Sequence, residues 1–214
     1  MDSMSLAEQE RAEFVGLLKS LTPEQWQTQS LCSGWSVYDV VAHVISYDEL
    51  DPRALLGRVA RAGFNPNRAN ALGVTDYRLR SQEDLIALVE KYRRPRGLTS
   101  LFGGMIALTD CMIHQQDIRR ALGLPREIPA ERIAPVLRFA LFAPPIRGIF
   151  KIWGVRAVAT DLDWCFGFGP EVRGKAEALL MAIAGRRGIL PELSGPGVAK
   201  LTPRIGGGVP QSRP

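Results

Sequence analysis

Several segments of the chain place apolar residues every three or four positions, and three of these segments begin with a capping box. In a capping box, a Ser or Thr side chain binds the backbone three residues ahead, where another side chain reaches back. Such boxes begin at Thr22, Ser36 and Ser81. Because each box marks the start of a helix, the first half of the chain is constrained to a mainly helical fold.

Four longer helices are expected in this half, joined by connections of mixed length. A short helix after Thr22, a poorer helix after Pro52 and a loop over residues 63–70 separate them. Four helices with such connections predict a bundle, which we place at residues 5–127. The four expected helices span roughly residues 5–21, 36–50, 81–94 and 98–122.

Beyond residue 128 the pattern of apolar residues changes. Residues 155–169 alternate like one or two strands, and residues 197–205 are expected to form another. Helices are expected over residues 130–142 and 174–187. The pattern therefore predicts a small α+β region at residues 128–205. The remaining segment, residues 206–214, reads GGGVPQSRP and is expected to be a disordered tail.

The chain contains only two histidines, and each lies on the apolar face of an expected helix. His43 occurs in DVVAHVI, and His114 occurs in LTDCMIHQQDI, four residues after Asp110. A helix places such a pair on one face, about 6 Å apart. Asp110 and His114 can therefore bind one metal ion, with His43 as a third ligand from a second helix. Three nitrogen and oxygen ligands with an open fourth position are typical of a catalytic zinc site.

Other interpretations of these residues stay open at the level of sequence. Each histidine could be a core residue bonded to a backbone carbonyl, and Asp-x-x-x-His pairs arise by chance. Cys111 is a competing ligand, ranked behind Asp110 because a lone cysteine is usually a small buried apolar residue. Three aromatic residues near His43 are expected either to line a pocket or to join the core: Trp26, Trp35 and Tyr47.

Two further carboxylates lie within helical reach of the histidines. Asp39 is four residues before His43, but its capping position explains it better. Asp117 lies three residues after His114 and could orient that imidazole. We favour a pairing of Asp117 with Arg120 on the helix surface instead.

Composition and charge exclude several functional classes. No stretch of about 18 apolar residues occurs, and the acidic, polar N-terminus does not fit a signal peptide. Three cysteines without regular spacing suit a reducing compartment, so we expect a cytoplasmic protein. The net charge is +5, but the basic residues are dispersed and no recognition motif accompanies them, so nucleic-acid binding is not expected.

Three segments together carry a resemblance to a known family. They read LTPEQW, SLCSGWSVYDVVAHVISYDEL and LTDCMIHQQDIRRALGLPR. In combination they resemble the mycothiol-dependent maleylpyruvate isomerase-like group of the DinB superfamily. The later segment VRAVATDLDWCFGFGPEVRGKAEALLMAIAGR resembles the C-terminal region of actinobacterial members, so the resemblance covers roughly residues 7–203.

The resemblance implies a DinB-like four-helix bundle with a divalent metal, zinc or nickel, near one end. Its ligands in the family are a His on the second helix and a Glu-x-x-x-His pair on a later helix. Carried over, these are His43, Asp110 and His114. Asp110 replaces the family's Glu and is one methylene shorter, so its helix must come closer or a water must intervene. The C-terminal region also looks shorter than that of the isomerase, so we transfer no substrate-binding arginine from it.

The function that the resemblance implies is that of a metal-dependent enzyme using mycothiol or a similar low-molecular-weight thiol. Its reaction would be isomerisation of, or sulfur transfer to, a small electrophilic substrate. No membrane or nucleic-acid partner is implied, and a homodimer is compatible because DinB-like bundles often pair. The alternative is a non-catalytic DinB-like module that binds a metal or another ligand.

Overall fold

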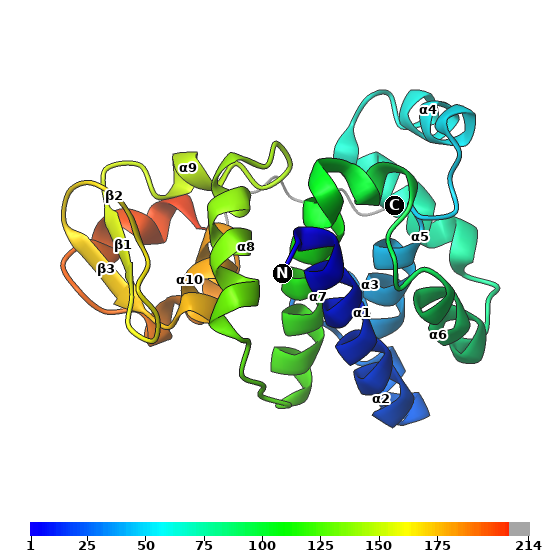
Figure 1. Cartoon of the computed structure of the whole chain (residues 1–214), viewed down its shortest axis with the longest axis horizontal. Helices are drawn as coiled ribbons and strands as arrows, with labels where there is room; N and C mark the ends of the chain where they lie inside the picture. The colour runs from blue at the N-terminus through cyan, green and yellow to red at the C-terminus, as the bar shows by residue number, and fades with distance from the viewer. Residues whose placement is uncertain (206–214) are drawn as a thin grey trace. The chain divides into compact units, whose positions relative to one another are not determined.

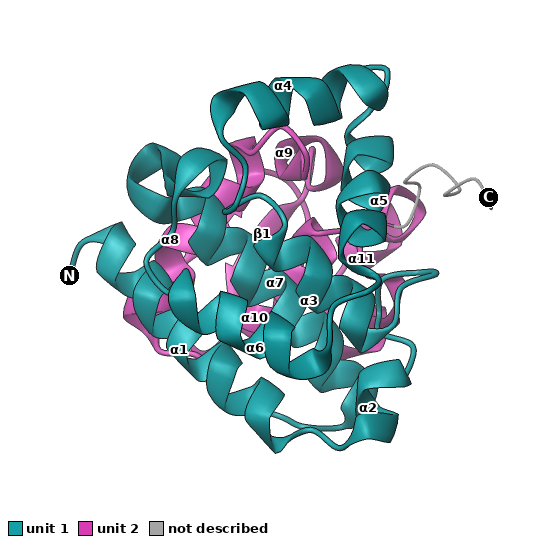
Figure 2. Ribbon diagram, turned by 90° about the vertical axis from the view of Figure 1, so that its right-hand side faces the viewer, with its two compact units in different colours: residues 1–125 teal, residues 126–214 magenta. Residues whose placement is uncertain are grey.

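The computed structural model of the protein describes residues 1–205, so the expected disordered tail lies outside the described residues. The chain divides into two compact units, Met1–Pro125 and Arg126–Pro214 (Figure 2). The fold class is as predicted: the protein is mainly helical, with a helix bundle followed by a small α+β region. None of the helices within residues 1–205 is long and apolar enough to span a lipid bilayer.

Four helices form the bundle of the first unit (Figure 1): α1 (Ser3–Ser20), α3 (Val37–Ile45), α6 (Gln82–Lys91) and α7 (Met105–Leu122). Helices α1 and α3 each contact both α6 and α7, so the four helices close around one core. That core is built from the apolar faces that helical spacing predicts. Its largest fully buried side chains include Phe14, Leu18, Trp26, Ile45 and Leu85.

Three further helices of the first unit follow their caps, and one of them corrects a prediction. Helix α2 (Pro23–Gln27) begins at the capping box of Thr22, and α4 (Pro52–Arg61) begins after Asp51. Residues 63–70 were expected to form a loop, but α5 (Pro66–Tyr77) starts inside them. The Asn65 side chain accepts hydrogen bonds from the backbone of residues 67 and 68, so Asn-Pro here starts a helix.

Two helices of the first unit span fewer residues than their apolar patterns predict. The second ends at Ile45 instead of near Leu50, because Asp48 turns inward to a buried arginine of α1. The segment 98–122 divides into the 3-10 helix η1 (Gly97–Gly104) and α7. Gly103 and Gly104 have positive φ angles of 66° and 87°, which an α-helix does not accommodate.

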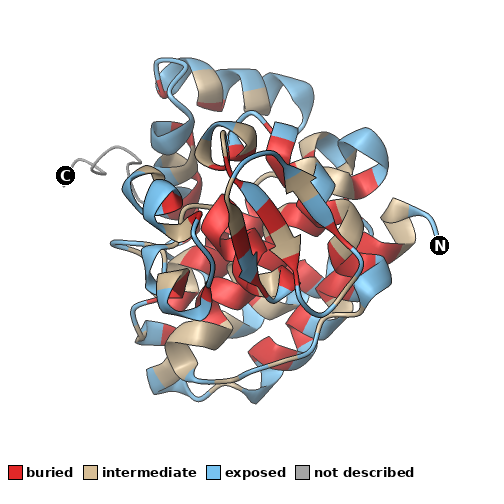
Figure 3. Cartoon of the chain, turned by 90° about the vertical axis from the view of Figure 1, so that its left-hand side faces the viewer, coloured by how far each residue is buried: buried red, intermediate tan, exposed pale blue. Residues whose placement is uncertain are grey.

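The second unit places a three-stranded sheet against a buried helix. Strand β1 (Arg156–Ala159) pairs antiparallel with β2 (Cys165–Gly167) and parallel with β3 (Glu171–Gly174). Burial alternates along β1 and β3 (Figure 3), and both strands contact α10 (Ala176–Ile183). Helix α10 also contacts α8 (Ala130–Phe142). The remaining short helices of this unit are α9 (Gly148–Lys151), η2 (Arg187–Glu192), α11 (Val198–Leu201) and η3 (Thr202–Arg204).

The strand expected at residues 197–205 is wrong, because these residues form α11 and η3. The place beside β1 is taken by β3, which directly follows β2 and was not predicted. Gly197 touches this edge, donating its N–H to the carbonyl of Glu171 at 2.8 Å, before the chain turns into α11.

Removing one cap is expected to destabilise the bundle measurably. Ser81 Oγ accepts from the Asp84 N–H at 3.0 Å, and Asp84 Oδ2 accepts from the Ser81 N–H at 3.1 Å. We expect Ser81→Ala to lower the free energy of unfolding in urea by about 1 kcal/mol, since the amides at the start of α6 lose a partner. Ser33→Ala, at an exposed loop position, is the control. Equal stability of the two variants would contradict the role of the cap.

Candidate metal centre

The position of His43 follows from the cap of α3. Ser36 Oγ accepts from the Asp39 N–H at 3.2 Å, and Asp39 Oδ2 accepts from the Ser36 N–H at 2.9 Å. The capping role of Asp39 is therefore confirmed. With the helix start defined in this way, His43 falls about two turns along α3 on its buried side, where its side chain is 7% exposed.

The structure brings the three candidate ligands to one point. Asp110 Oδ1 lies 3.5 Å from His43 Nε2 and 3.5 Å from His114 Nε2. The two imidazole rings meet edge to face with centroids 4.8 Å apart. One ligand atom from each of the three residues lies within 4.8 Å of the other two. Asp110 thus reaches both histidines although it is one methylene shorter than the glutamate of the family pattern.

The spacing of these atoms suits a shared metal ion better than direct hydrogen bonds. A charge-assisted hydrogen bond between imidazole and carboxylate is about 2.7–2.9 Å long. Tetrahedral zinc with bonds of about 2.1 Å separates neighbouring nitrogen and oxygen ligands by about 3.4 Å. The two observed distances of 3.5 Å match the second value.

The electrostatics of the centre favour charged side chains. Burial alone would raise the pKa of the Asp110 carboxyl, but the imidazoles of His114 and His43 lower it more strongly. Burial alone would lower the pKa of His114, but Asp110, Cys32 and Asp117 hold it well above its usual value. The arrangement therefore attracts positive charge, which a proton or a metal dication can supply.

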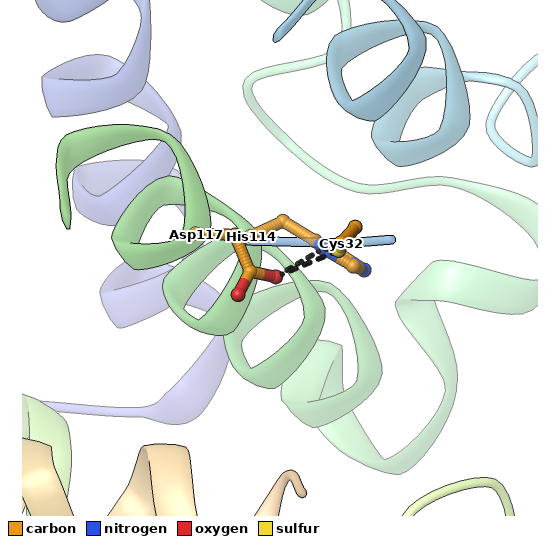
Figure 4. A group of neighbouring side chains, drawn as sticks. All are labelled: Cys32, His114 and Asp117. Carbon is orange, nitrogen blue, oxygen red and sulfur yellow. Dashed lines mark hydrogen bonds and ion pairs between the residues drawn. The ribbon is translucent and has the colours of Figure 1, made fainter. Parts of the chain in front are cut away.

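The second nitrogen of His114 faces a carboxylate and a thiol (Figure 4). His114 Nδ1 lies 3.0 Å from Oδ2 of Asp117, which is fully buried. Cys32 Sγ donates to the same oxygen at 3.0 Å and lies 3.6 Å from His114 Nδ1. The orienting role of Asp117, which we ranked behind a pairing with Arg120, is therefore the one that these contacts support. Sequence reasoning missed Cys32.

Cys111 and the three aromatic residues divide between the core of the bundle and the surroundings of His43. Cys111 is fully buried in the core of the bundle, and among the described residues it does not join the three candidate ligands. Trp26 is likewise a core residue. Trp35 and Tyr47 instead contact His43, with ring centroids 5.0 Å and 6.1 Å away. Burial raises the pKa of the Tyr47 phenol, whose O–H donates to Asn70 Oδ1 at 2.6 Å.

The three candidate ligands differ in how far their side chains are exposed. The side chains of His43 and His114 are 7% and 12% exposed, whereas that of Asp110 is 32% exposed. The rings of Trp35 and Tyr47 contact His43, which is the least exposed of the three. The most exposed of the three candidate ligands is therefore Asp110.

The N-terminal part of the chain matches a known domain family. Residues 7–96 match the family described as Mycothiol maleylpyruvate isomerase N-terminal domain. The match covers less than half of the chain. The matched segment contains α3 with His43 and the loop with Cys32, and the match supports the resemblance drawn from the sequence. No curated protein matches the chain significantly.

Two solved structures share the fold along nearly the whole chain. The crystal structure of the mycothiol-dependent maleylpyruvate isomerase matches with a TM-score of 0.52 and 16% identity. A histidine-to-alanine variant of that isomerase matches with a TM-score of 0.55 and 14% identity. Each match covers 99% of this chain and 95% of the other. The shorter C-terminal region expected from the sequence is therefore not evident at the level of the fold, since 95% of the solved chain is covered.

Proposed function

We propose that His43, Asp110 and His114 bind one divalent metal ion and that the protein is a thiol-dependent enzyme built around it. The reaction we propose is isomerisation of a small conjugated acid of the maleylpyruvate type, with mycothiol as the thiol. The observation that carries the proposal is the pair of 3.5 Å distances from Asp110 Oδ1 to the two imidazole nitrogens. The domain family and the fold of the solved isomerase support the choice of thiol and substrate.

The donor set fits zinc or nickel. Two imidazole nitrogens and one carboxylate oxygen are ligands that both metals accept, and they leave a position open. When bound, the metal would lower the pKa of a coordinated thiol, so that thiolate, which adds reversibly to a conjugated double bond, is present at neutral pH.

The protein's own residues supply the positions and the surroundings. With the metal bound, His43 and His114 would be the neutral ligands and Asp110 would contribute the negative charge. Asp117 accepts from His114 Nδ1 and so keeps the lone pair of Nε2 directed at the centre. Trp35 and Tyr47 place apolar ring surface beside His43 and limit the access of water on that side.

The residues of the proposed centre all come from the first unit. Its candidate ligands, Asp117, Cys32 and the two aromatic residues lie within Met1–Pro125. We therefore propose the bundle, predicted at residues 5–127, as the metal-binding domain of a cytoplasmic enzyme. The α+β region at residues 128–205 is then a separate C-terminal region.

A direct assay tests this function. Protein purified without a histidine tag and loaded with one equivalent of Zn²⁺ or Ni²⁺ is mixed with mycothiol and maleylpyruvate, and loss of the cis acid is followed by chromatography. We expect turnover that falls to the uncatalysed background when either the thiol or the metal is left out. Metal-loaded protein that shows no turnover with mycothiol or other low-molecular-weight thiols would contradict the enzymatic proposal and favour a non-catalytic metal-binding module.

A further inference from the structure

The loop between α2 and α3 is closed by its own polar side chains. Ser30 donates to the carbonyl of Trp35 through both its backbone N–H, at 3.0 Å, and its hydroxyl, at 2.8 Å. The Gln29 side-chain amide donates to the carbonyls of Ser30, Cys32 and Trp35 at 2.7–2.9 Å. These bonds give residues 29–35 one defined conformation, from which Cys32 and Trp35 both reach the metal centre.

Two hydrogen bonds connect the same loop to a single residue of α7, Asp117. The Leu31 N–H donates to the backbone carbonyl of Asp117 at 3.2 Å, and the Cys32 thiol donates to its side-chain Oδ2 at 3.0 Å. Figure 4 shows Cys32 and His114 converging on that carboxylate. Because Asp117 is fully buried, its carboxylate depends on such donors in place of water.

We propose that Cys32 is a positioning residue of the metal centre. Through Asp117, its thiol holds the His114 ring so that Nε2 faces Asp110 and His43. This inference rests on the proposed metal site and deepens it. A ligating histidine needs its other nitrogen bonded to a second group, and the loss of such a group weakens metal binding. Here that group is Asp117, and the thiol helps to keep its Oδ2 in place.

The distances separate this role from that of a metal ligand. Cys32, His114 and Asp117 also lie close enough together to be considered as a metal-binding group. A thiolate and a carboxylate bound to one zinc, with bonds of about 2.3 and 2.1 Å, would lie about 3.6 Å apart. The observed distance from Cys32 Sγ to Asp117 Oδ2 is 3.0 Å, which is that of a hydrogen bond. The Cys32 thiol therefore acts as a hydrogen-bond donor to Asp117, on the Nδ1 side of His114.

The test compares a variant that removes the donor with one that keeps it. Dissociation constants for Zn²⁺ and Co²⁺ are measured by competition with a chelator on tag-free protein, and the visible absorption spectrum of the Co²⁺ form reports the ligand geometry. Cys32→Ala is expected to weaken binding about tenfold and Asp117→Ala up to about a hundredfold, with a changed Co²⁺ spectrum. Cys32→Ser keeps a donor and is expected to stay within about threefold of wild type. Cys165→Ala, at an exposed cysteine of β2, is the matched control.

The outcomes distinguish this inference from the proposed function. Wild-type affinity and an unchanged Co²⁺ spectrum in Cys32→Ala would overturn the positioning role while leaving the metal site intact. A second equivalent of metal that disappears in Cys32→Ala would overturn it as well, because Cys32 would then be a ligand. Wild-type protein that binds neither ion would overturn both proposals. Should Cys32→Ala fail to fold by circular dichroism, Cys32→Ser decides, since strongly weakened binding there would contradict a role as donor.

Discussion

His114→Ala is expected to abolish stoichiometric binding of a divalent metal. The chain has only two histidines, and both face Asp110 Oδ1 at 3.5 Å, so no other imidazole can replace the lost ligand. Binding of structural zinc by four ligands contributes about 10–16 kcal/mol, or about 3 kcal/mol per ligand, so we expect the affinity to fall by about 10²–10³-fold. The measurement is the metal content of tag-free protein after dialysis against a weak chelator.

Variants of the other two candidate ligands, and a control substitution elsewhere, test whether the lost metal was bound at this centre. His43→Ala and Asp110→Asn are expected to lose the metal as well, since each removes one of the three candidate ligands. Asp163→Asn makes the same chemical change as Asp110→Asn at an exposed position of the second unit and should keep the metal. Full metal content in His43→Ala, with the helical circular dichroism of wild type, would show that the ion binds elsewhere and would refute the centre.

The grouping of the candidate ligands follows from local helix geometry, which is why the sequence predicts it. Asp110 and His114 share a helix face because they are four residues apart. The capping box at Ser36 sets the start of α3 and thereby the side on which His43 lies. What brings α3 and α7 together is the burial of their apolar faces in one core, and the pattern of those faces can also be read along the chain.

The contacts of Cys32 and Asp117 with His114 could not be predicted in the same way. Cys32 and His114 are 82 residues apart, and no periodicity links a loop residue to a helix that follows so much later. The contact depends on how the loop closes, through side-chain bonds from Gln29 and Ser30 to backbone carbonyls. The sequence does indicate Asp117 as a partner for His114, but spacing alone does not distinguish a bond to His114 from one to Arg120.

Some of the misjudged elements share a physical cause, because tertiary contacts overrode local apolar patterns. The second helix stops at Ile45 because Asp48 is needed by Arg11. In the second unit, the partner of β1 is the short segment that directly follows β2, and residues 197–205 become helical. The four residues of β3 carry too little alternation to be identified from sequence.

We expect Arg11→Met to destabilise the bundle more than any single change at its surface. Arg11 and Asp48 are buried, and they form two parallel bonds of 2.9 Å. Asp48 Oδ1 also accepts from the Thr99 hydroxyl at 2.6 Å and from the Arg96 N–H at 3.1 Å. Removing the guanidinium leaves a buried carboxylate without its cation, which costs about 3–5 kcal/mol. Urea unfolding followed by circular dichroism measures the loss.

A surface pair of the same kind shows why burial decides the size of this effect. Lys19 and Glu90 lie 3.0 Å apart, but their side chains are 55% and 50% exposed. Lys19→Met is therefore expected to cost less than about 1 kcal/mol, because water solvates the carboxylate that remains. In the double variant Arg11→Met, Asp48→Asn no charge is left buried, so its loss should be smaller than that of Arg11→Met alone. A double variant less stable than Arg11→Met would contradict the unpaired charge as the cause, and would indicate that the bonds of Asp48 to Thr99 and Arg96 contribute more than its pairing with Arg11.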